Sequence, residues 1–177
     1  HPRIKEALKT AFSGKCAYCE SHVVHIDYGD IEHFRPKSKF PELCFHWKNL
    51  LLSCGICNDT AHKGDHFPDS EEGGPLVNPA DENPDEFFYF EFDPATGTAN
   101  VLPKNQRGHT TELILGLNRK ELVQHRSAVV RKMVYVAICA SQGDNEALHE
   151  ISSCCSKENE YSAFARSLVY RFSLPLL

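Results

Sequence analysis

Residues 30–38 read DIEHFRPKS, and residues 47–58 read WKNLLLSCGICN. In the first segment Glu32 stands directly before His33, and in the second Asn49 opens a short apolar run that ends in a Cys-x-x-Cys pair. Carboxylate, imidazole and amide groups so close along a chain suit one divalent ion and one activated water. The two segments therefore predict a metal-dependent hydrolytic site.

The predicted local structure around these segments is strand, loop, strand and helix. We expect a strand over 23–33 that is interrupted at Tyr28-Gly29, a loop over 34–46, a strand over 49–53 and a helix over 57–65. Asn58 and His62 are four residues apart, so a helix would place both on one face. This ββα arrangement would hold every candidate ligand of a catalytic ion.

The cysteines predict a second, structural metal site. Eight cysteines occur, and four of them form two Cys-x-x-Cys pairs, Cys16 with Cys19 and Cys54 with Cys57. Four thiolates complete the tetrahedral shell of Zn²⁺ and leave no open position for catalysis. An even cysteine count also fits disulfides, but the chain has no secretory signal and is large enough to fold without them. We therefore expect a zinc ion that clamps the first strand to the helix.

The catalytic ion would take a different ligand set, Glu32, Asn58 and His62. One carboxylate, one amide and one imidazole leave positions open for water and phosphate, which suits Mg²⁺ or Mn²⁺, and also a borderline metal such as Zn²⁺ or Ni²⁺. Neighbouring residues on a strand point to opposite sides, so Glu32 and His33 would divide the roles of ligand and base.

The rest of the chain predicts an α+β fold with a helical C-terminal half. We expect a helix over 2–13, an acidic loop over 68–86, a β-hairpin over 87–102, and helices at 110–116, from a cap at Asn118 to about 140, at 145–155 and at 158–172. Leu122, Val129, Met133, Val136 and Ala137 would face inward along the long helix. The expected domains are 1–109, a catalytic domain with its core at 14–68, and 110–177, a helical extension.

Composition is that of a soluble globular protein. The 177 residues are 41% hydrophobic and 24% charged, with a net charge of −5. Charge is segregated: residues 67–93 carry nine acids and no Lys or Arg, whereas residues 101–135 carry seven Lys or Arg and two acids. No apolar run approaches the roughly 18–20 residues of a membrane span. We expect a cytoplasmic protein, and because the chain begins at His1, part of a longer one.

Together these residues resemble the HNH endonucleases, whose ββα-metal fold carries an acid-histidine pair, a central Asn and a terminal His or Asn. The match covers residues 14–68. The closest resemblance is to the PtuB branch, the HNH subunits of Septu and related retron anti-phage defence systems. The segments that carry it are CAYCE at 16–20, DIEHFRPKS at 30–38, KGDHFP at 63–68, LVNP at 76–79 and LGLNR at 115–119.

The resemblance implies a role for each matching position. His33 would be the general base, and Asn49 would tie down the loop that orients it. Glu32, Asn58 and His62 would hold one Mg²⁺ or Mn²⁺ on the scissile phosphate. The substrate phosphates would be bound by Arg35, Lys37 and Lys63. Asn58 stands where many family members have His, so the share of ligand duty among Asn58, His62 and His66 stays open.

The resemblance also implies the biological setting. The protein would cleave DNA as the effector of an anti-phage complex, together with a PtuA-like ATPase of the SMC/ABC type in a hetero-oligomer. Residues 110–177 would dock that partner. Cleavage of RNA, with tRNA as one target, is an alternative because activated water needs no 2′-hydroxyl group. A zinc module that docks a partner without catalysis is another, although such a module needs no Glu32-His33 pair.

Overall fold

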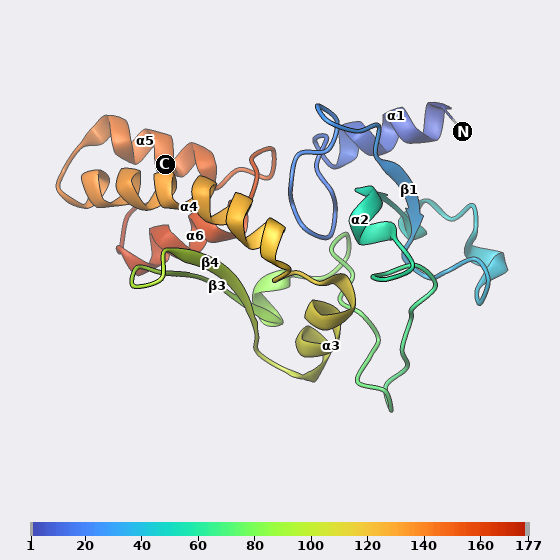
Figure 1. Ribbon diagram of the computed structural model, residues 1–177. Coiled ribbons are helices and arrows are strands. Elements are labelled where there is room, and N and C mark those ends of the chain that lie inside the picture. Colours follow the sequence, from blue (N-terminus) through green and yellow to red (C-terminus); the bar gives the residue numbers. More distant parts are fainter. Residues whose placement is uncertain (1, 176–177) are drawn as a thin grey trace. The chain divides into compact units, whose positions relative to one another are not determined.

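The computed structural model describes residues 2–175, and it confirms a mixed α+β protein (Figure 1). The chain forms two compact units. One contains residues 2–88 and 102–117, and the other contains residues 89–101 and 118–175. Most of the β-hairpin therefore belongs to the same unit as the C-terminal helices. No helix within the described residues is long and apolar enough to cross a lipid bilayer.

The first unit is built on a two-stranded antiparallel sheet. Strand β1 (Asp30–His33) pairs with β2 (Leu50–Ser53), so that Glu32 lies opposite Leu51 and His33 opposite Leu50. Helix α1 (Pro2–Ala11) covers this sheet, and Leu8 forms a buried core with Leu50 and Leu52. The predicted second strand is confirmed. The first is shorter than predicted, because residues 24–29 turn back on themselves and pair with no strand.

Helix α2 (Gly55–Asn58) is much shorter than the helix predicted over 57–65. Cys54 caps its start, where the thiol accepts a hydrogen bond from the Cys57 amide. The backbone turns extended at Asp59, with ψ at 153°, and residues 60–65 form successive turns. The prediction that one helix face carries both Asn58 and His62 is therefore wrong. Residues 59–66 contain a single apolar side chain, so a longer helix would have had no apolar face to bury.

The loop between the two strands carries two short 3-10 helices, η1 (Pro41–Leu43) and η2 (Trp47–Asn49). After α2 the chain runs through the predicted acidic loop, which ends in η3 (Pro84–Glu86). Helix α3 (Gln106–Leu115) completes the unit. It begins four residues before the predicted helix, because the Asn105 side chain caps it by accepting a hydrogen bond from the Gly108 amide.

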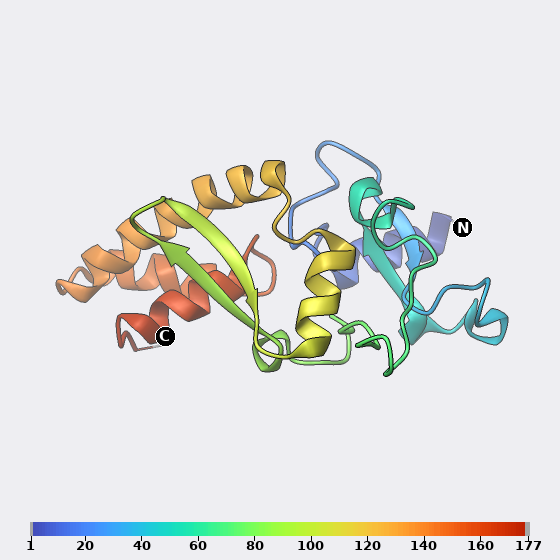
Figure 2. The ribbon, with the colours of Figure 1, turned by 60° about the horizontal axis from the view of Figure 1, so that its bottom comes forward.

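The second unit joins the predicted hairpin to three helices. Strands β3 (Phe88–Asp93) and β4 (Thr98–Pro103) run side by side as one ribbon (Figure 2). The helices are α4 (Lys120–Ser141), α5 (Asn145–Cys154) and α6 (Ser162–Arg171). Of the residues predicted to face inward on α4, Leu122, Met133 and Ala137 are buried, and Val129 and Val136 are half-buried.

Asn118 does not cap the long helix, contrary to prediction; the cap position is Arg119. The Asn118 side chain instead accepts a hydrogen bond from the Val101 amide at 3.0 Å and donates one to the Val101 carbonyl at 2.7 Å. The buried Arg126 guanidinium donates to the same Asn118 oxygen and to the Ala99 carbonyl. These bonds hold β4 against α4, so Asn118 ties strand to helix.

Candidate functional site

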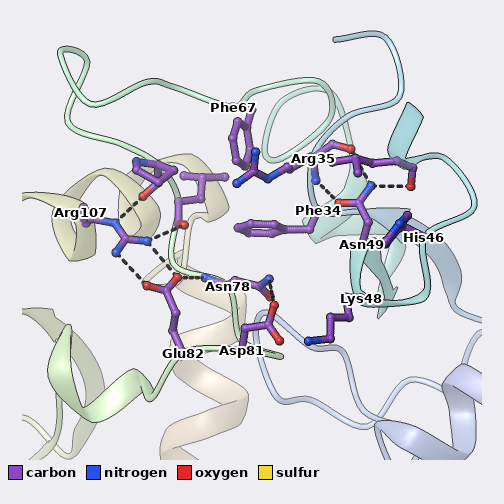
Figure 3. A pocket seen from close by; sticks show the side chains of 13 residues that line it. Phe34, Arg35, His46, Lys48, Asn49, Phe67, Asn78, Asp81, Glu82 and Arg107 are labelled. Carbon is purple, nitrogen blue, oxygen red and sulfur yellow. Dashed lines mark hydrogen bonds and ion pairs between the residues drawn. The ribbon is translucent and has the colours of Figure 1, made fainter. Parts of the chain in front are cut away.

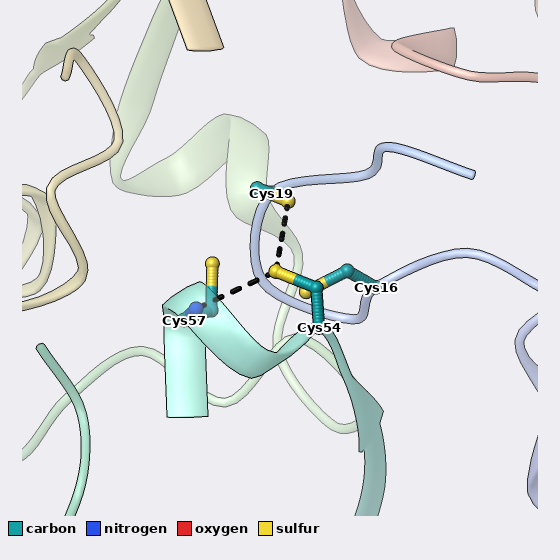
Figure 4. Close-up of side chains that lie close together, drawn as sticks. All are labelled: Cys16, Cys19, Cys54 and Cys57. Carbon is teal, nitrogen blue, oxygen red and sulfur yellow. Dashed lines mark hydrogen bonds between the residues drawn. The ribbon is translucent and has the colours of Figure 1, made fainter. Parts of the chain in front are cut away.

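Four cysteines from distant parts of the chain converge on one point (Figure 4). Cys16 and Cys19 come from the loop after α1, Cys54 stands at the cap of α2, and Cys57 lies within that helix. All four sulfur atoms lie within 4.8 Å of one another, and those of Cys19 and Cys54 are 4.0 Å apart. A tetrahedral zinc ion with bonds of about 2.3 Å spaces its thiolates roughly 3.8 Å apart. The cluster therefore fits a structural metal ion such as zinc, as predicted.

The four thiols do not titrate alike. Hydrogen bonding to Cys16 lowers the pKa of Cys19 and of Cys54, whereas burial raises the pKa of Cys16. Hydrogen bonds to the other three thiols raise the pKa of Cys57. None of the eight cysteines in the described chain forms a disulfide. Because thiolate is the ligand form, loading a metal here would release protons.

Glu32 lies inside the first unit, with 6% of its side chain exposed. Its Oε1 atom is 3.1 Å from the Lys63 ammonium and accepts a hydrogen bond from the Tyr18 hydroxyl at 3.2 Å. Burial raises the pKa of Glu32 and lowers the pKa of Lys63, although each charge favours the charged form of the other. Because Tyr18 belongs to the first cysteine pair, Glu32 joins that segment to the turns after α2.

Lys63, which the sequence placed among the phosphate contacts, has a side chain with no exposed surface. Its ammonium also donates a hydrogen bond to the Gly64 carbonyl, and its amide donates to the Cys57 carbonyl. Arg35 and Lys37, the other two candidates, are exposed. The Arg35 guanidinium stacks on two rings, 5.5 Å from the Phe40 centroid and 5.7 Å from the Phe67 centroid.

His33 ends β1, and its Nε2 atom lies 3.0 Å from the Cys44 carbonyl oxygen. A carbonyl oxygen can only accept a hydrogen bond, so this contact places the proton on Nε2 and leaves the lone pair on Nδ1. The ring is only partly buried. An imidazole held in this tautomer can accept a proton at Nδ1.

Asn49 is buried where η2 meets β2. Its side-chain oxygen accepts a hydrogen bond from the Arg35 amide at 2.8 Å. Its amide group donates to the Arg35 carbonyl at 3.0 Å and to the Leu43 carbonyl at 3.2 Å. One side chain thus fastens both ends of the loop that follows His33, including the residue that precedes Cys44.

Asn58 is the last residue of α2, and His62 lies in the turns that follow it. The Asn58 amide donates a hydrogen bond to the Asp30 carboxylate at 3.2 Å. Within residues 2–175 the His62 Nδ1 atom is buried without a hydrogen-bond partner. His66 is exposed, and its Nδ1 atom lies 2.6 Å from the His62 carbonyl. Within the described chain, the four cysteines are the group of three or more His, Cys, Asp or Glu side chains that lie close enough together to hold a metal ion. Neither Glu32 nor His62 belongs to such a group of described residues.

Asp30 and Tyr18 were not identified from the sequence. Asp30 precedes Glu32 by two residues on the same strand, so both carboxylates lie on one side of β1. This alternation was a usable signal for Asp30. No sequence signal identifies Tyr18, because its contact with Glu32 depends on how the first cysteine pair folds against the sheet.

No protein-family model and no solved structure matches the chain. Curated relatives do. The chain is 33% identical over 154 residues to the Septu protein PtuB of Bacillus mycoides, covering 72% of this chain and 51% of that protein. It is 34% identical over 136 residues to the Septu protein PtuB of Bacillus thuringiensis, covering 75% and 48%. The chain therefore spans about half the length of these relatives.

A more distant relative is matched over a larger share of its length. The chain is 23% identical over 171 residues to the retron Vc95 putative HNH endonuclease of Vibrio cholerae, which covers 93% of this chain and 80% of that protein. The resemblance to PtuB and HNH proteins inferred from the sequence motifs is thereby confirmed.

Proposed function

We propose that this chain, a relative of the Septu PtuB proteins and of a retron HNH endonuclease, is a metal-dependent HNH endonuclease that hydrolyses DNA as the effector of an anti-phage defence complex. The observation that carries the proposal is the hydrogen bond between His33 Nε2 and the Cys44 carbonyl. It gives a histidine on the strand of a ββα segment the proton arrangement of a general base.

In the proposed reaction, His33 Nδ1 takes a proton from the water that attacks phosphorus. The Cys44 carbonyl keeps the ring in the required tautomer and orientation. Asn49 acts one step further away, because it binds the Leu43 carbonyl and so fixes the backbone that presents Cys44. Asn49 is a positioning residue in this scheme and does not touch the substrate.

For the catalytic ion we propose Asn58 and His62 together with a carboxylate of β1. Two observations support this ligand set: within residues 2–175 the His62 Nδ1 atom is buried without a hydrogen-bond partner, and Asn58 contacts the Asp30 carboxylate. A bound Mg²⁺ or Mn²⁺ would stabilise negative charge on the phosphate and on the leaving 3′-oxygen. Glu32, the carboxylate predicted from sequence, competes with Asp30 for this role.

For substrate binding we propose the exposed Arg35 and Lys37, which lie on the loop directly after His33. Lys63 remains a phosphate contact only if the buried pair with Glu32 opens. In the closed arrangement we propose that Lys63 positions Glu32 and thereby β1.

For the partner we propose a PtuA-like ATPase of the SMC/ABC type, bound by the helical region 110–177. Support comes from the names of the relatives and from large exposed side chains on the second unit. Tyr135 on α4 is 64% exposed and Tyr170 on α6 is 89% exposed. Replacing both with Ser should abolish co-purification with the ATPase and leave zinc content unchanged. A complex that survives the double substitution contradicts docking through these side chains.

The experiment for the nuclease activity uses the full-length protein, alone and with its co-expressed ATPase partner. Supercoiled DNA and a structured RNA such as tRNA are incubated with Mg²⁺, with Mn²⁺ or without either ion. The proposal expects nicking of DNA only with a divalent ion. Cleavage of RNA in preference to DNA would change the proposed substrate to RNA and leave the proposed hydrolysis mechanism unchanged. No cleavage of either polymer under any condition would favour a non-catalytic zinc module.

A further inference from the structure

A cavity of about 440 Å³ lies in the first unit beside the strand that carries His33 (Figure 3). Phe34 and Arg35, the two residues that follow His33, form part of its lining. The Phe34 amide donates a hydrogen bond to the Asn49 carbonyl at 3.0 Å, so the cavity wall continues from the β1–β2 sheet. Its volume lies in the range of about 300–1,000 Å³ that is usual for ligand sites. Neither the general base nor the proposed ion uses it.

One side of the cavity is aromatic. Phe34 packs edge-to-face against Phe67, with ring centroids 5.3 Å apart and planes at 90°. The Arg35 guanidinium stacks on Phe67 in turn. Figure 3 shows Phe34 in the middle of the lining, with Arg35 and Phe67 on one side and Asn78 and Asp81 on the other. Flat rings beside a planar cation offer a stacking surface for a nucleobase.

The opposite side presents hydrogen-bonding groups. The Asn78 side-chain amide donates to Asp81 Oδ2 at 3.3 Å, and Asp81 is an exposed residue of the cavity lining. A carboxylate accepts hydrogen bonds and donates none. A base would therefore meet an acceptor here, which suits the exocyclic amino group of adenine, cytosine or guanine. Thymine and uracil carry no amino group. Their one donor on this edge, the ring N3–H, is flanked by two carbonyl oxygens that the carboxylate would repel.

This polar side is held in place before any ligand binds. The Arg107 guanidinium donates to both oxygens of Glu82, at 2.8 and 2.9 Å, and to the Pro75 and Leu76 carbonyls at 2.8 and 3.1 Å. Glu82 also accepts a hydrogen bond from the Asn78 amide nitrogen of the backbone at 2.8 Å. These contacts occupy the Arg107 guanidinium. Arg107 therefore supports the cavity wall and does not itself bind the ligand.

Cations stand beside the cavity. Lys48 is exposed, and its ammonium makes no hydrogen bond or ion pair with any residue from 2 to 175. The exposed Arg35 guanidinium contacts aromatic rings and no acidic group of the described chain. A phosphate flanking a bound base would find these charges. An apolar ligand would leave the cations and Asp81 unused.

We propose that this cavity receives an unstacked nucleobase next to the phosphodiester that His33 attacks, and that Asp81 selects bases with an exocyclic amino group. The inference rests on the proposed nuclease function and names the feature of the nucleic acid that the same site recognises. A base must leave its stack to enter such a cavity, so single-stranded or distorted segments are the expected substrates.

The first test maps cleavage ends. The full-length protein with its partner cuts randomised DNA and RNA pools, and the base frequencies around each cut are sequenced. We expect thymine or uracil to be depleted roughly tenfold at one fixed position beside the cut. Asp81→Asn should flatten this bias. Glu71→Gln removes an exposed acid outside the cavity and should preserve the bias.

The second test measures binding without cleavage. Trp47, the single tryptophan, lies between the two cavity residues His46 and Lys48 and is 51% exposed, so its fluorescence reports ligand binding. Short oligonucleotides that differ in one base are titrated without added Mg²⁺ or Mn²⁺. Those with an amino-bearing base should bind about tenfold more tightly than those with thymine or uracil, and Asp81→Asn should remove the difference.

The two tests separate failure of this inference from failure of the nuclease. Cleavage with equal base frequencies at every position, or with a bias that Asp81→Asn leaves intact, overturns the base-binding cavity and leaves the nuclease standing. A base preference in binding without any cleavage supports the cavity and contradicts the nuclease. Equal binding of all bases overturns the cavity whatever the cleavage result.

Discussion

The Lys63 ammonium lies 3.1 Å from the Glu32 carboxylate, and the two side chains are 0% and 6% exposed. Glu32 comes from β1 and Lys63 from the turns after α2, so the pair joins two parts of the candidate site. Tyr18, from the first cysteine pair, donates to the same carboxylate oxygen. A buried ion pair of this kind fixes geometry more than it adds net stability.

Removing one partner of this pair should therefore be costly, and removing both should be much less so. Lys63→Met leaves a buried carboxylate without its cation and should lower the free energy of unfolding by about 3–5 kcal/mol. The double variant Glu32→Gln/Lys63→Met should recover most of that loss. Urea unfolding of the zinc-loaded proteins measures both. Strictly additive effects of the two substitutions would show that the residues do not interact.

The carboxylate that binds the catalytic ion can be identified by titration. If Asp30 is the ligand, Asp30→Asn should raise the Mn²⁺ concentration needed for half-maximal cleavage at least tenfold, whereas Glu32→Gln should mainly lower the stability. His62→Ala should behave like Asp30→Asn because it removes the buried Nδ1 atom. A large metal effect in Glu32→Gln and none in Asp30→Asn would return the role to Glu32.

Asn49→Ala should impair cleavage without disturbing the four-cysteine cluster. The substitution removes three hydrogen bonds that hold the Arg35 and Leu43 backbone, at a cost of about 1–3 kcal/mol in unfolding free energy. The loop that presents the Cys44 carbonyl to His33 then loosens, so kcat should fall more than KM changes. Zinc content, measured by atomic emission, serves as the control. A change confined to KM would place Asn49 in substrate binding instead.

Removing the structural metal should unfold the first unit. The helical signal that remains should then come from the helices of the second unit. The cluster connects the loop after α1 to α2, and among the described residues the core beside it contains only three buried side chains, Leu8, Leu50 and Leu52. We expect one zinc per chain, loss of zinc in Cys54→Ser, and release of protons when zinc is added back to the apoprotein. Cys139→Ser, an exposed cysteine outside the cluster, is the matched control. Unchanged zinc binding in Cys54→Ser would contradict the site.

The pair formed by Glu82 and Arg107 should make stability depend on acidity. Burial raises the pKa of Glu82, but hydrogen bonds from Arg107 and from the Asn78 backbone outweigh it, so that the pKa is lowered. A lowered pKa in the folded state stabilises the protein above the ordinary carboxyl pKa of about 4.3, and this stabilisation disappears as the pH falls through the lowered value. The stability difference between wild type and Glu82→Gln should therefore shrink with acidification below about pH 4. A difference independent of pH would contradict the pairing.

Local chemistry made much of this site predictable. Two Cys-x-x-Cys pairs supply the four thiolates that a tetrahedral zinc ion needs. The run of leucines before Cys54 predicts a buried strand from composition alone. The cluster and the strand appear where predicted. The role of Asn49 came from the family resemblance and not from local chemistry; its side chain makes three hydrogen bonds to the loop backbone, and its part in orienting His33 stays a prediction.

The errors arose where tertiary contacts decide. Spacing alone placed Asn58 and His62 on one helix, yet α2 ends at Asn58 because the amide of Lys63 returns to the Cys57 carbonyl and the segment has no apolar face. Lys63 has a charged side chain that composition assigns to the surface, but its partner Glu32 lies 31 positions away. Asn is a residue type favoured at helix caps, but the Asn118 side chain forms hydrogen bonds with the backbone of β4 instead.

The most direct test of the central claim is single-turnover cleavage by the His33→Ala variant of the zinc-loaded protein with its partner and Mn²⁺. We expect the rate to fall by about 10²–10⁴-fold, as it does when a general base is lost, with zinc content and thermal stability unchanged. His25→Ala, which alters an exposed histidine before β1, should cleave like wild type. A His33→Ala protein that cleaves at the wild-type rate would contradict the assignment of this site as a nuclease centre.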